Sequence, residues 1–271
     1  MHPGYQIIVC AGIVPDPLQT LEPVSTGGAA PALKNEAMLP AILDPWAAHA
    51  LYEAAHLASQ NVGSKVWLLS LGPKNKLQQV MMTVAQKVAF EFVAIDGAAG
   101  GFSEAQDTAD ALAQAIRSIE GIDPARLLLF GGWESASRGA GATLQVVGEQ
   151  LGIADQFQGV DGLTVRDDGS LEILERVEGG RHQVSICAGP PVVLGWATGN
   201  LSEPRNNPQM GMANLRGVMP ALQKAKAFRP ADGGARFVRA GAPRQQRETR
   251  VIKNLPPAAI AREIAAWIGK D

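Results

Sequence analysis

The fold is decided by residues 65–88, which read KVWLLSLGPKNKLQQVMMTVAQKV. The first part, 65–71, is a short apolar run closed by Gly72-Pro73, which is typical of a strand buried on both faces. The second part, 74–88, is predicted to be a helix. A strand followed directly by a helix is the building unit of parallel α/β sheets.

Three more units of this kind occur, one before residues 65–88 and two after them. In chain order, the four predicted strands are 5–12, 65–71, 90–96 and 126–131, and the helices that follow them are 44–60, 74–88, 103–120 and 139–151. Asp44 at the N-cap and Pro45 at the first helical position mark one helix start, and Ser103 is predicted to cap another. Four β-then-α units in succession predict an α/β domain with a parallel sheet and helices on both faces.

The pattern changes after Gly159. Strand-like runs at 162–165, 171–177 and 182–187 are separated by Asp167-Asp168-Gly169 and Glu178-Gly179-Gly180. Asp-Gly and Gly-Gly steps favour hairpin turns because their central residues must take positive φ. We therefore expect antiparallel hairpins to be added to the parallel sheet.

The rest of the chain is predicted to hold one more buried strand, a long loop, an arm and a helix. These cover 191–198, 200–217, 228–249 and 256–268 in that order. The arm is basic and contains Gly and Pro, and the final helix is amphipathic. We expect residues 1–227 to form the α/β domain and 228–271 a C-terminal arm and helix that pack on another chain.

Composition excludes several classes of protein. The 24 Lys and Arg residues and 26 Asp and Glu residues give a net charge of −2, which argues against binding nucleic acid through phosphate neutralisation. A hydrophobic content of 46% with 18% charged residues excludes a disordered chain. We find no signal-peptide pattern and no apolar stretch of roughly 18 residues. The expectation is a cytoplasmic protein with no direct membrane insertion.

Ligands of open parallel sheets bind beyond the carboxyl ends of the strands. The most informative segment there is 137–143, SRGAGAT, which combines small residues, an Arg and hydroxyls at a predicted helix start. This combination could cradle a phosphate. The glycines could equally serve only to let a helix pack closely on the sheet. The segment lacks the Gly-Lys-Ser/Thr of a Walker loop, and no Gly-x-Gly-x-x-Gly is present.

Other candidate residues each have a plain structural explanation. His49, Glu53 and His56 fall at i, i+4 and i+7, where one helix face could hold a metal ion, although such single-helix sets are seldom metal sites. Cys10 and Cys187 lie in apolar runs and are expected to be buried, unreactive thiols. Trp46 could pack on a planar ligand or fill the core. No Ser/His/Asp arrangement of a hydrolase stands out.

The order of several short motifs is similar to that of a known family. The chain resembles the β subunit of electron transfer flavoproteins over almost its whole length. The motifs are Val9-Cys10-Ala11 leading to Val14-Pro15-Asp16, Asp44-Pro45-Trp46, Ala50-Leu51-Tyr52-Glu53-Ala54, Ser70-Leu71-Gly72-Pro73, the two hairpin turns, Pro191-Val192-Val193, Glu203-Pro204-Arg205 and Lys224-Ala225-Lys226.

This resemblance implies a Rossmann-like sheet of the adenine nucleotide α-hydrolase type. It implies a heterodimer with a larger α subunit, which carries most contacts to one FAD, while many β subunits hold a structural AMP. Such a pair is an electron carrier, not an enzyme in its own right: it passes electrons from a dehydrogenase to a quinone reductase or another acceptor. The alternative is a free-standing nucleotide-binding module of the same fold, although such modules are short and lack the hairpins and tail.

Residue by residue, the resemblance assigns a cofactor pocket and a partner-docking segment. The pocket residues are Cys10, Ala11, Asp44, Pro45, Trp46, Ala47, Leu71, Ser137, Arg138, Gly139, Ala140, Gly141, Ala142, Thr143, Leu144 and Gln145. The docking residues are Glu203, Pro204, Arg205, Met210, Met212 and Met219.

Two departures from the family pattern stand out. The family's Gln-Thr-Gly step is Ala142-Thr143-Leu144 here, so most polar side chains that would hold AMP are missing and AMP stays an open question. Arg138 is predicted to hold a different phosphate. The segment 206–221 is longer than in the family, and its methionines suit an adaptable partner surface or an unstructured insertion.

Overall fold

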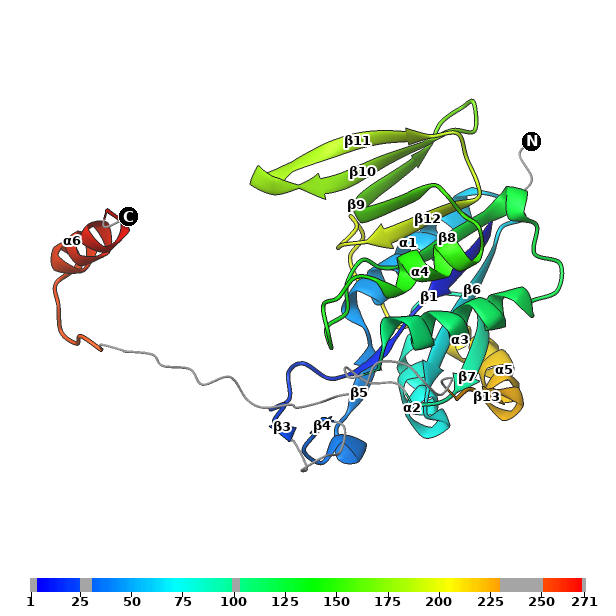
Figure 1. Ribbon diagram of the computed structural model, residues 1–271, viewed down its shortest axis with the longest axis horizontal. Coiled ribbons are helices and arrows are strands. Elements are labelled where there is room, and N and C mark those ends of the chain that lie inside the picture. Colours follow the sequence, from blue (N-terminus) through cyan, green and yellow to red (C-terminus); the bar gives the residue numbers. More distant parts are fainter. Residues whose placement is uncertain (1–3, 25–30, 99–102, 230–250, 270–271) are drawn as a thin grey trace. The chain divides into compact units, whose positions relative to one another are not determined.

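The computed structural model describes residues 4–24, 31–98, 103–229 and 251–269 (Figure 1). The chain divides into two compact units, residues 1–240 and residues 241–271. Most of the predicted arm, 230–250, lies outside the described residues, and the predicted boundary at 227/228 stays a prediction.

The first unit is built on one large sheet. Its described strands form a nine-stranded sheet in the order β11-β10-β9-β12-β8-β1-β6-β7-β13. In that order the strands are Arg181–Cys187, Leu171–Val177, Gln156–Val165, Val192–Trp196, Leu127–Gly132, Gln6–Cys10, Lys65–Gly72, Glu91–Asp96 and Lys226–Ala227. Pairing is parallel from β9 to β13 and antiparallel across β9, β10 and β11. The predicted α/β fold with added antiparallel strands is confirmed.

Helices cover both faces of the sheet (Figure 1). One face packs on α1 (Pro45–Gln60), α2 (Lys74–Val84) and α5 (Pro208–Lys224). The other face packs on α3 (Ala105–Arg117) and α4 (Thr143–Gln150). Strand β1 is buried along its whole length, because its side chains enter both apolar layers.

Short elements connect β1 to α1. The pair β2 (Ile13–Pro15) and β5 (Ala41–Leu43) is antiparallel, as is the pair β3 (Pro23–Val24) and β4 (Ala32–Leu33). At the end of β5, the Asp44 carboxylate accepts a hydrogen bond from the Trp46 amide, and Pro45 opens the helix. The predicted N-cap is therefore confirmed.

Three predictions of secondary structure are wrong. Residues 200–217 are not one long loop, because α5 begins at Pro208, where the Asn207 side chain accepts from two backbone amides. The helix predicted from Gly139 begins only at Thr143, since Gly139 and Gly141 take positive φ values of 66° and 64°. Ser103 caps nothing: Glu104 is at the N-cap of α3, without a side-chain cap bond within the described residues.

The second unit contains the helix α6 (Pro257–Ile268), as predicted. Its large apolar side chains are exposed, with Trp267 82% and Ile264 54% accessible. Among the helices in the described part of the chain, none combines the length and apolar composition needed to span a bilayer.

Candidate functional site

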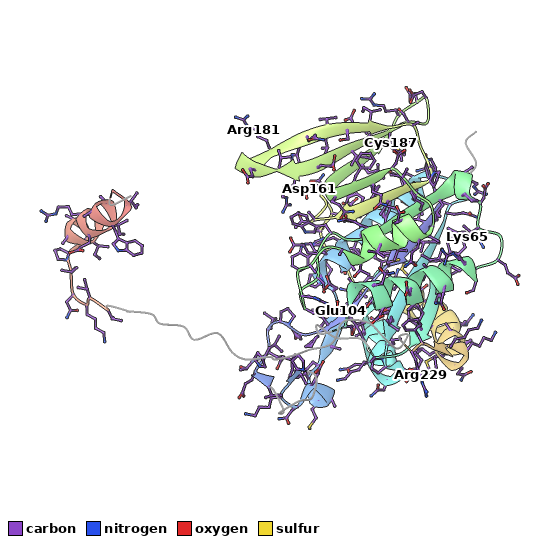
Figure 2. The ribbon with its side chains drawn as sticks, viewed as in Figure 1. Lys65, Glu104, Asp161, Arg181, Cys187 and Arg229 are labelled. Carbon is purple, nitrogen blue, oxygen red and sulfur yellow. The ribbon has the colours of Figure 1, made fainter. Side chains whose placement is uncertain are left out.

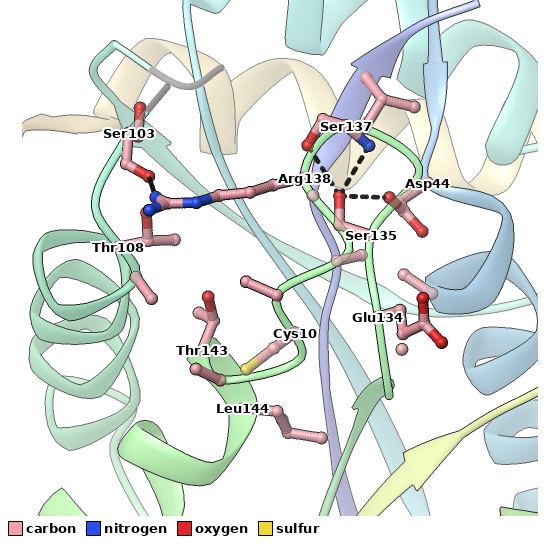
Figure 3. Close-up of a pocket in the computed structure, with 18 of the residues that line it drawn as sticks. Cys10, Asp44, Ser103, Thr108, Glu134, Ser135, Ser137, Arg138, Thr143 and Leu144 are labelled. Carbon is pink, nitrogen blue, oxygen red and sulfur yellow. Dashed lines mark hydrogen bonds between the residues drawn. The ribbon is translucent and has the colours of Figure 1, made fainter. Parts of the chain in front are cut away.

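A cavity of about 160 Å³ lies at the carboxyl ends of the central strands (Figure 3). Its walls come from the ends of β1, β6 and β8, from the starts of α1, α3 and α4, and from the loop between β8 and α4. Strand β1 has β6 on one side and β8 on the other, so the chain reverses its direction across the sheet between β1 and β8. Open α/β sheets bind ligands at this reversal point.

Asp44 holds two walls of the cavity together. Its Oδ1 accepts from the Trp46 amide at 3.2 Å. Its Oδ2 accepts from the Ser135 hydroxyl at 2.8 Å and from the Ala136 amide at 2.9 Å. Burial raises the pKa of the Asp44 carboxyl, while these hydrogen bonds oppose the rise. Its polar atoms are engaged within the protein, so Asp44 shapes the cavity.

Glycine is required in the loop between β8 and α4. Gly141 has φ +64°, and a Cβ there would lie 2.8 Å from the Trp133 carbonyl oxygen. Gly132 stands at the end of β8, where a Cβ would lie 2.7 Å from Trp46 Cβ. These glycines let the loop turn back over the sheet and let α1 approach β8. The packing role that the sequence allowed for the glycines is therefore present, next to the cavity.

The start of α4 offers donors to an anion. Its first intrahelical bond runs from the Val146 amide to the Ala142 carbonyl, 3.1 Å, and no side chain caps it within the described residues. The amides of Thr143, Leu144 and Gln145 precede that bond and carry the positive end of the helix dipole. Thr143 adds a hydroxyl at the cavity wall. This is a donor set suited to a phosphate.

Arg138 crosses one side of the cavity (Figure 3). Its Nη1 donates to the Ser103 carbonyl oxygen at 2.6 Å, and its Nη2 lies 3.5 Å from Glu104 Oε2. The loop after β8 is thereby tied to the start of α3. Ser103, which does not cap α3, supplies this bridge with its carbonyl oxygen.

Part of the cavity wall is apolar or weakly polar. Cys10, Ala11, Leu71 and Leu112 line the cavity and are buried. Burial raises the pKa of the Cys10 thiol to about 12, so the thiolate does not form near neutral pH. Cys187 is also buried, and burial raises its pKa as well. Both cysteines are buried as predicted.

The structure brings most of the predicted pocket residues together. Twelve of them line the cavity: Cys10, Ala11, Asp44, Ala47, Leu71, Ser137, Arg138, Ala140, Gly141, Ala142, Thr143 and Leu144. Four do not line it: Pro45, Trp46, Gly139 and Gln145. Leu144 is buried and packs into the apolar layer on this face of the sheet. Its side chain lies so close to β8 that a Cβ on Gly131 would be 3.0 Å from Leu144 Cδ1.

Sequence reasoning missed four polar residues of the cavity wall. Ser103 and Thr108 come from the start of α3, and Glu134 and Ser135 follow β8 directly. Position at the carboxyl end of β8 is the signal that could have found Glu134 and Ser135.

The predicted docking residues lie in α5 and in the segment just before it. Lys87 pairs with Glu203 at 2.6 Å and donates to the Pro204 carbonyl oxygen at 3.3 Å. Met212 and Met219 are 64% and 38% exposed. Met210 instead faces inward, lining a groove with Tyr52 and Phe90, while Arg205 is exposed. Two of the three methionines are therefore available to another molecule.

Two members of the His49, Glu53 and His56 set make hydrogen bonds to other residues. Glu53 accepts a hydrogen bond from the Asn200 amide at 2.9 Å, and His56 bonds to the Gln60 side chain at 3.0 Å. No cluster of three or more metal-ligating side chains occurs within the described residues.

A second polar network lies on the hairpin strands. Asp161 on β9 (Figure 2) accepts from Arg176 at 2.8 and 2.9 Å and lies 3.0 Å from His182 Nε2. It also accepts from the Thr198 amide at 3.3 Å. Desolvation alone would raise the pKa of Asp161, but the bonds from Arg176 and His182 outweigh it and the pKa is lowered. This network joins three strands to the segment that precedes the docking residues.

The fold and the cavity together define a doubly wound α/β domain of the ligand-binding kind. Residues 35–233 match the electron transfer flavoprotein domain family, so the chain belongs to the electron transfer flavoprotein family. Proteins of this family carry electrons and are associated with flavin. The resemblance seen in the sequence is confirmed at this level. No curated protein gave a significant match to the chain.

Proposed function

We propose that this chain is the small (β) subunit of a heterodimeric electron transfer flavoprotein. It accepts electrons from a partner dehydrogenase through an FAD held mainly by the larger α subunit, and passes them to a quinone reductase or another acceptor. The observation that carries the proposal is the cavity at the β1–β8 reversal point. Segments far apart in the sequence, each similar to the β subunits, converge there.

The cavity suits the phosphate of an adenine nucleotide because backbone groups add to the few polar side chains that line it. Donors come from the backbone at the start of α4, from Thr143, and from Arg138 if it leaves Glu104. Apolar walls at Ala11 and Leu71 suit a base. These groups support AMP, although the polar side chains of the family are missing at Ala142 and Leu144.

For FAD, this chain supplies one wall. When bound, the flavin accepts and releases the electrons. Trp46 is half-buried in the first turn of α1, outside the cavity, and its Cβ is fixed against Gly132. A partly exposed aromatic ring on a rigid helix start suits packing against a planar ring system. We therefore assign Trp46 and Pro45 to the flavin side of the subunit.

Partner contacts are assigned to two regions. The exposed apolar side chains of α6 include Ile260 and Trp267, and they need a partner to leave water. We assign 228–271 to packing on the α subunit. We assign Glu203, Pro204, Arg205 and the exposed methionines of α5 to docking of the dehydrogenase, since mobile, polarizable side chains adapt to a partner.

Co-expression with the larger electron transfer flavoprotein subunit of the same organism tests the proposal. The pair is expected to co-elute with flavin absorbance, and denaturation is expected to release one FAD and one AMP per pair. Release of FAD without AMP would support the subunit assignment but would show that the pair does not hold AMP. Absence of both complex and flavin would favour the free-standing nucleotide-binding module.

A further inference from the structure

The Arg138 guanidinium is engaged by α3 rather than by the cavity. Its partners are the Ser103 carbonyl oxygen at 2.6 Å (Figure 3) and the Glu104 carboxylate at 3.5 Å. The Arg138 and Glu104 side chains are 38% and 35% exposed, so neither is locked in the core. Glu104 stands at the N-cap position of α3 but caps nothing within the described residues, which leaves its carboxylate for Arg138.

Arg138 is the one cationic side chain among the described residues that line the cavity. The same lining contains the carboxyl groups of Asp44 and Glu134. A phosphate in this cavity would therefore meet a single side-chain cation, in a lining that also contains two carboxyl groups. When Arg138 is paired with Glu104, its positive charge is partly neutralised, and an anionic ligand is attracted less strongly.

A carboxylate and a phosphate bind the guanidinium in the same way. The planar fork of N–H donors matches two oxygens of either group, so one fork does not serve both fully. Glu104 is not part of the cavity lining, but its carboxylate contacts the same guanidinium that a phosphate in the cavity would need. For the exchange, the Arg138 side chain must rotate away from both Glu104 and the Ser103 carbonyl oxygen. The loop backbone can stay in place, because Asp44 holds it separately through the Ala136 amide.

We propose that Glu104 is a specificity-determining residue of this cavity, which lowers its affinity for phosphate-bearing nucleotides by competing for Arg138. This rests on the proposed function, because it takes the cavity to be a nucleotide site. Arg138 exchanges the Glu104 carboxylate for the phosphate when such a ligand binds. An uncharged nucleoside has no phosphate to bind Arg138, so the Arg138–Glu104 ion pair stays intact when it binds.

The test measures binding of AMP and of adenosine to the full-length chain in complex with its larger subunit, by titration calorimetry. Glu104→Gln is expected to tighten AMP about two- to fivefold, the range for a partly exposed ion pair, and to leave adenosine unchanged. Arg138→Gln is expected to weaken AMP toward the affinity of adenosine. In the Arg138→Gln background, Glu104→Gln is expected to have no further effect. Glu172→Gln, which breaks the exposed Arg166–Glu172 pair on the hairpin, is the matched control.

An AMP-to-adenosine affinity ratio that Glu104→Gln leaves unchanged overturns the proposal, and so does a gain that persists without Arg138. If the pair holds FAD but no variant binds AMP, the proposal fails while the subunit assignment stands. If no pair forms, the same titrations are made on the full-length chain alone. A Glu104→Gln gain there supports the competition while the subunit assignment fails.

Discussion

The hydroxyl of Ser135 donates a hydrogen bond to the buried carboxylate of Asp44 at 2.8 Å. The two residues are 91 positions apart. The same carboxylate caps α1 and accepts from the Ala136 amide. One side chain therefore fixes both the helix start and the loop that form opposite sides of the cavity.

Replacing Asp44 by Ala is expected to lower the free energy of unfolding by about 2–3 kcal/mol, because a helix cap and two buried hydrogen bonds are lost. Ser135→Ala removes the hydroxyl's bonds to Asp44 and Ser137 but keeps the Ala136 bond to Asp44, and is expected to cost about 1 kcal/mol. Urea denaturation measures both. The control is Asp16→Ala, since Asp16 accepts one exposed bond from Leu18. Equal losses for Asp44→Ala and Asp16→Ala would refute the role of Asp44.

Asp161 gives a prediction about pH. Its folded pKa is lowered from the ordinary value of 3.8. The ionised carboxylate therefore stabilises the fold above pH 3.8, and this contribution is lost as the pH falls through the folded pKa. Asp161→Asn is expected to lower stability by about 1–2 kcal/mol at pH 7, because Arg176 is partly exposed and solvent screens the pair.

The difference between the native chain and Asp161→Asn is expected to shrink on acidification below pH 3.8. Denaturation curves at pH 7 and at several acidic values measure it. A difference that stays constant across this range would mean that packing, not ionisation, is responsible. Glu172→Gln, in an exposed ion pair, is expected to change stability by less than about 1 kcal/mol at any pH.

Gly132 gives a steric prediction. A methyl group there would lie 2.7 Å from Trp46 Cβ, 2.8 Å from the Glu134 carbonyl oxygen and 3.1 Å from the Ala47 amide nitrogen. Gly132→Ala is expected to destabilise the fold by about 1–3 kcal/mol, because backbone must move. Gly12→Ala is the matched control, with nothing within 4 Å of its Cβ. If thermal denaturation shows the same loss of stability for Gly132→Ala and Gly12→Ala, the close approach of α1 and β8 is contradicted.

Asn214 tests whether α5 is a docked helix. Its Nδ2 donates to the carbonyl oxygens of Ala85 at 2.8 Å and Val88 at 2.7 Å. Asn214→Ala is expected to lower the free energy of unfolding by about 1–2 kcal/mol, since two acceptors lose their donor. Met212→Ala, at a 64% exposed position, is expected to change stability by less than about 0.5 kcal/mol. A neutral Asn214→Ala would indicate that this segment is an undocked loop.

The sequence predicted the parts of the fold whose signals are local. Asp44-Pro45 marked the start of α1, and Asp168-Gly169 and Gly179-Gly180 marked the hairpin turns, because each depends on the preferences of a few neighbouring residues. Helix α5 was missed because Gly211, Gly217 and Pro220 interrupt its apolar pattern. It is nevertheless held by packing of Val218 and Leu222 on the sheet, which is a tertiary effect.

The cavity was predictable in position but not in its contacts. Strand ends and small residues located the segment around 137–144. The bridge from Arg138 to Ser103 and the bonds from Ser135 to Asp44 join residues 35 and 91 positions apart, and no local pattern specifies them. For the same reason the sequence could suggest Arg138 as a phosphate ligand from its residue type, which stays a prediction, while its contact with Glu104 could not be foreseen.

The most direct test of the central claim is native mass spectrometry of the chain purified with its larger subunit. We expect a single species that contains one copy of each chain and one FAD, and that is absent when either chain is expressed alone. A spectrum that shows only the free chain, with all flavin on the larger subunit or none bound at all, would contradict the assignment of this protein as a subunit of an electron transfer flavoprotein.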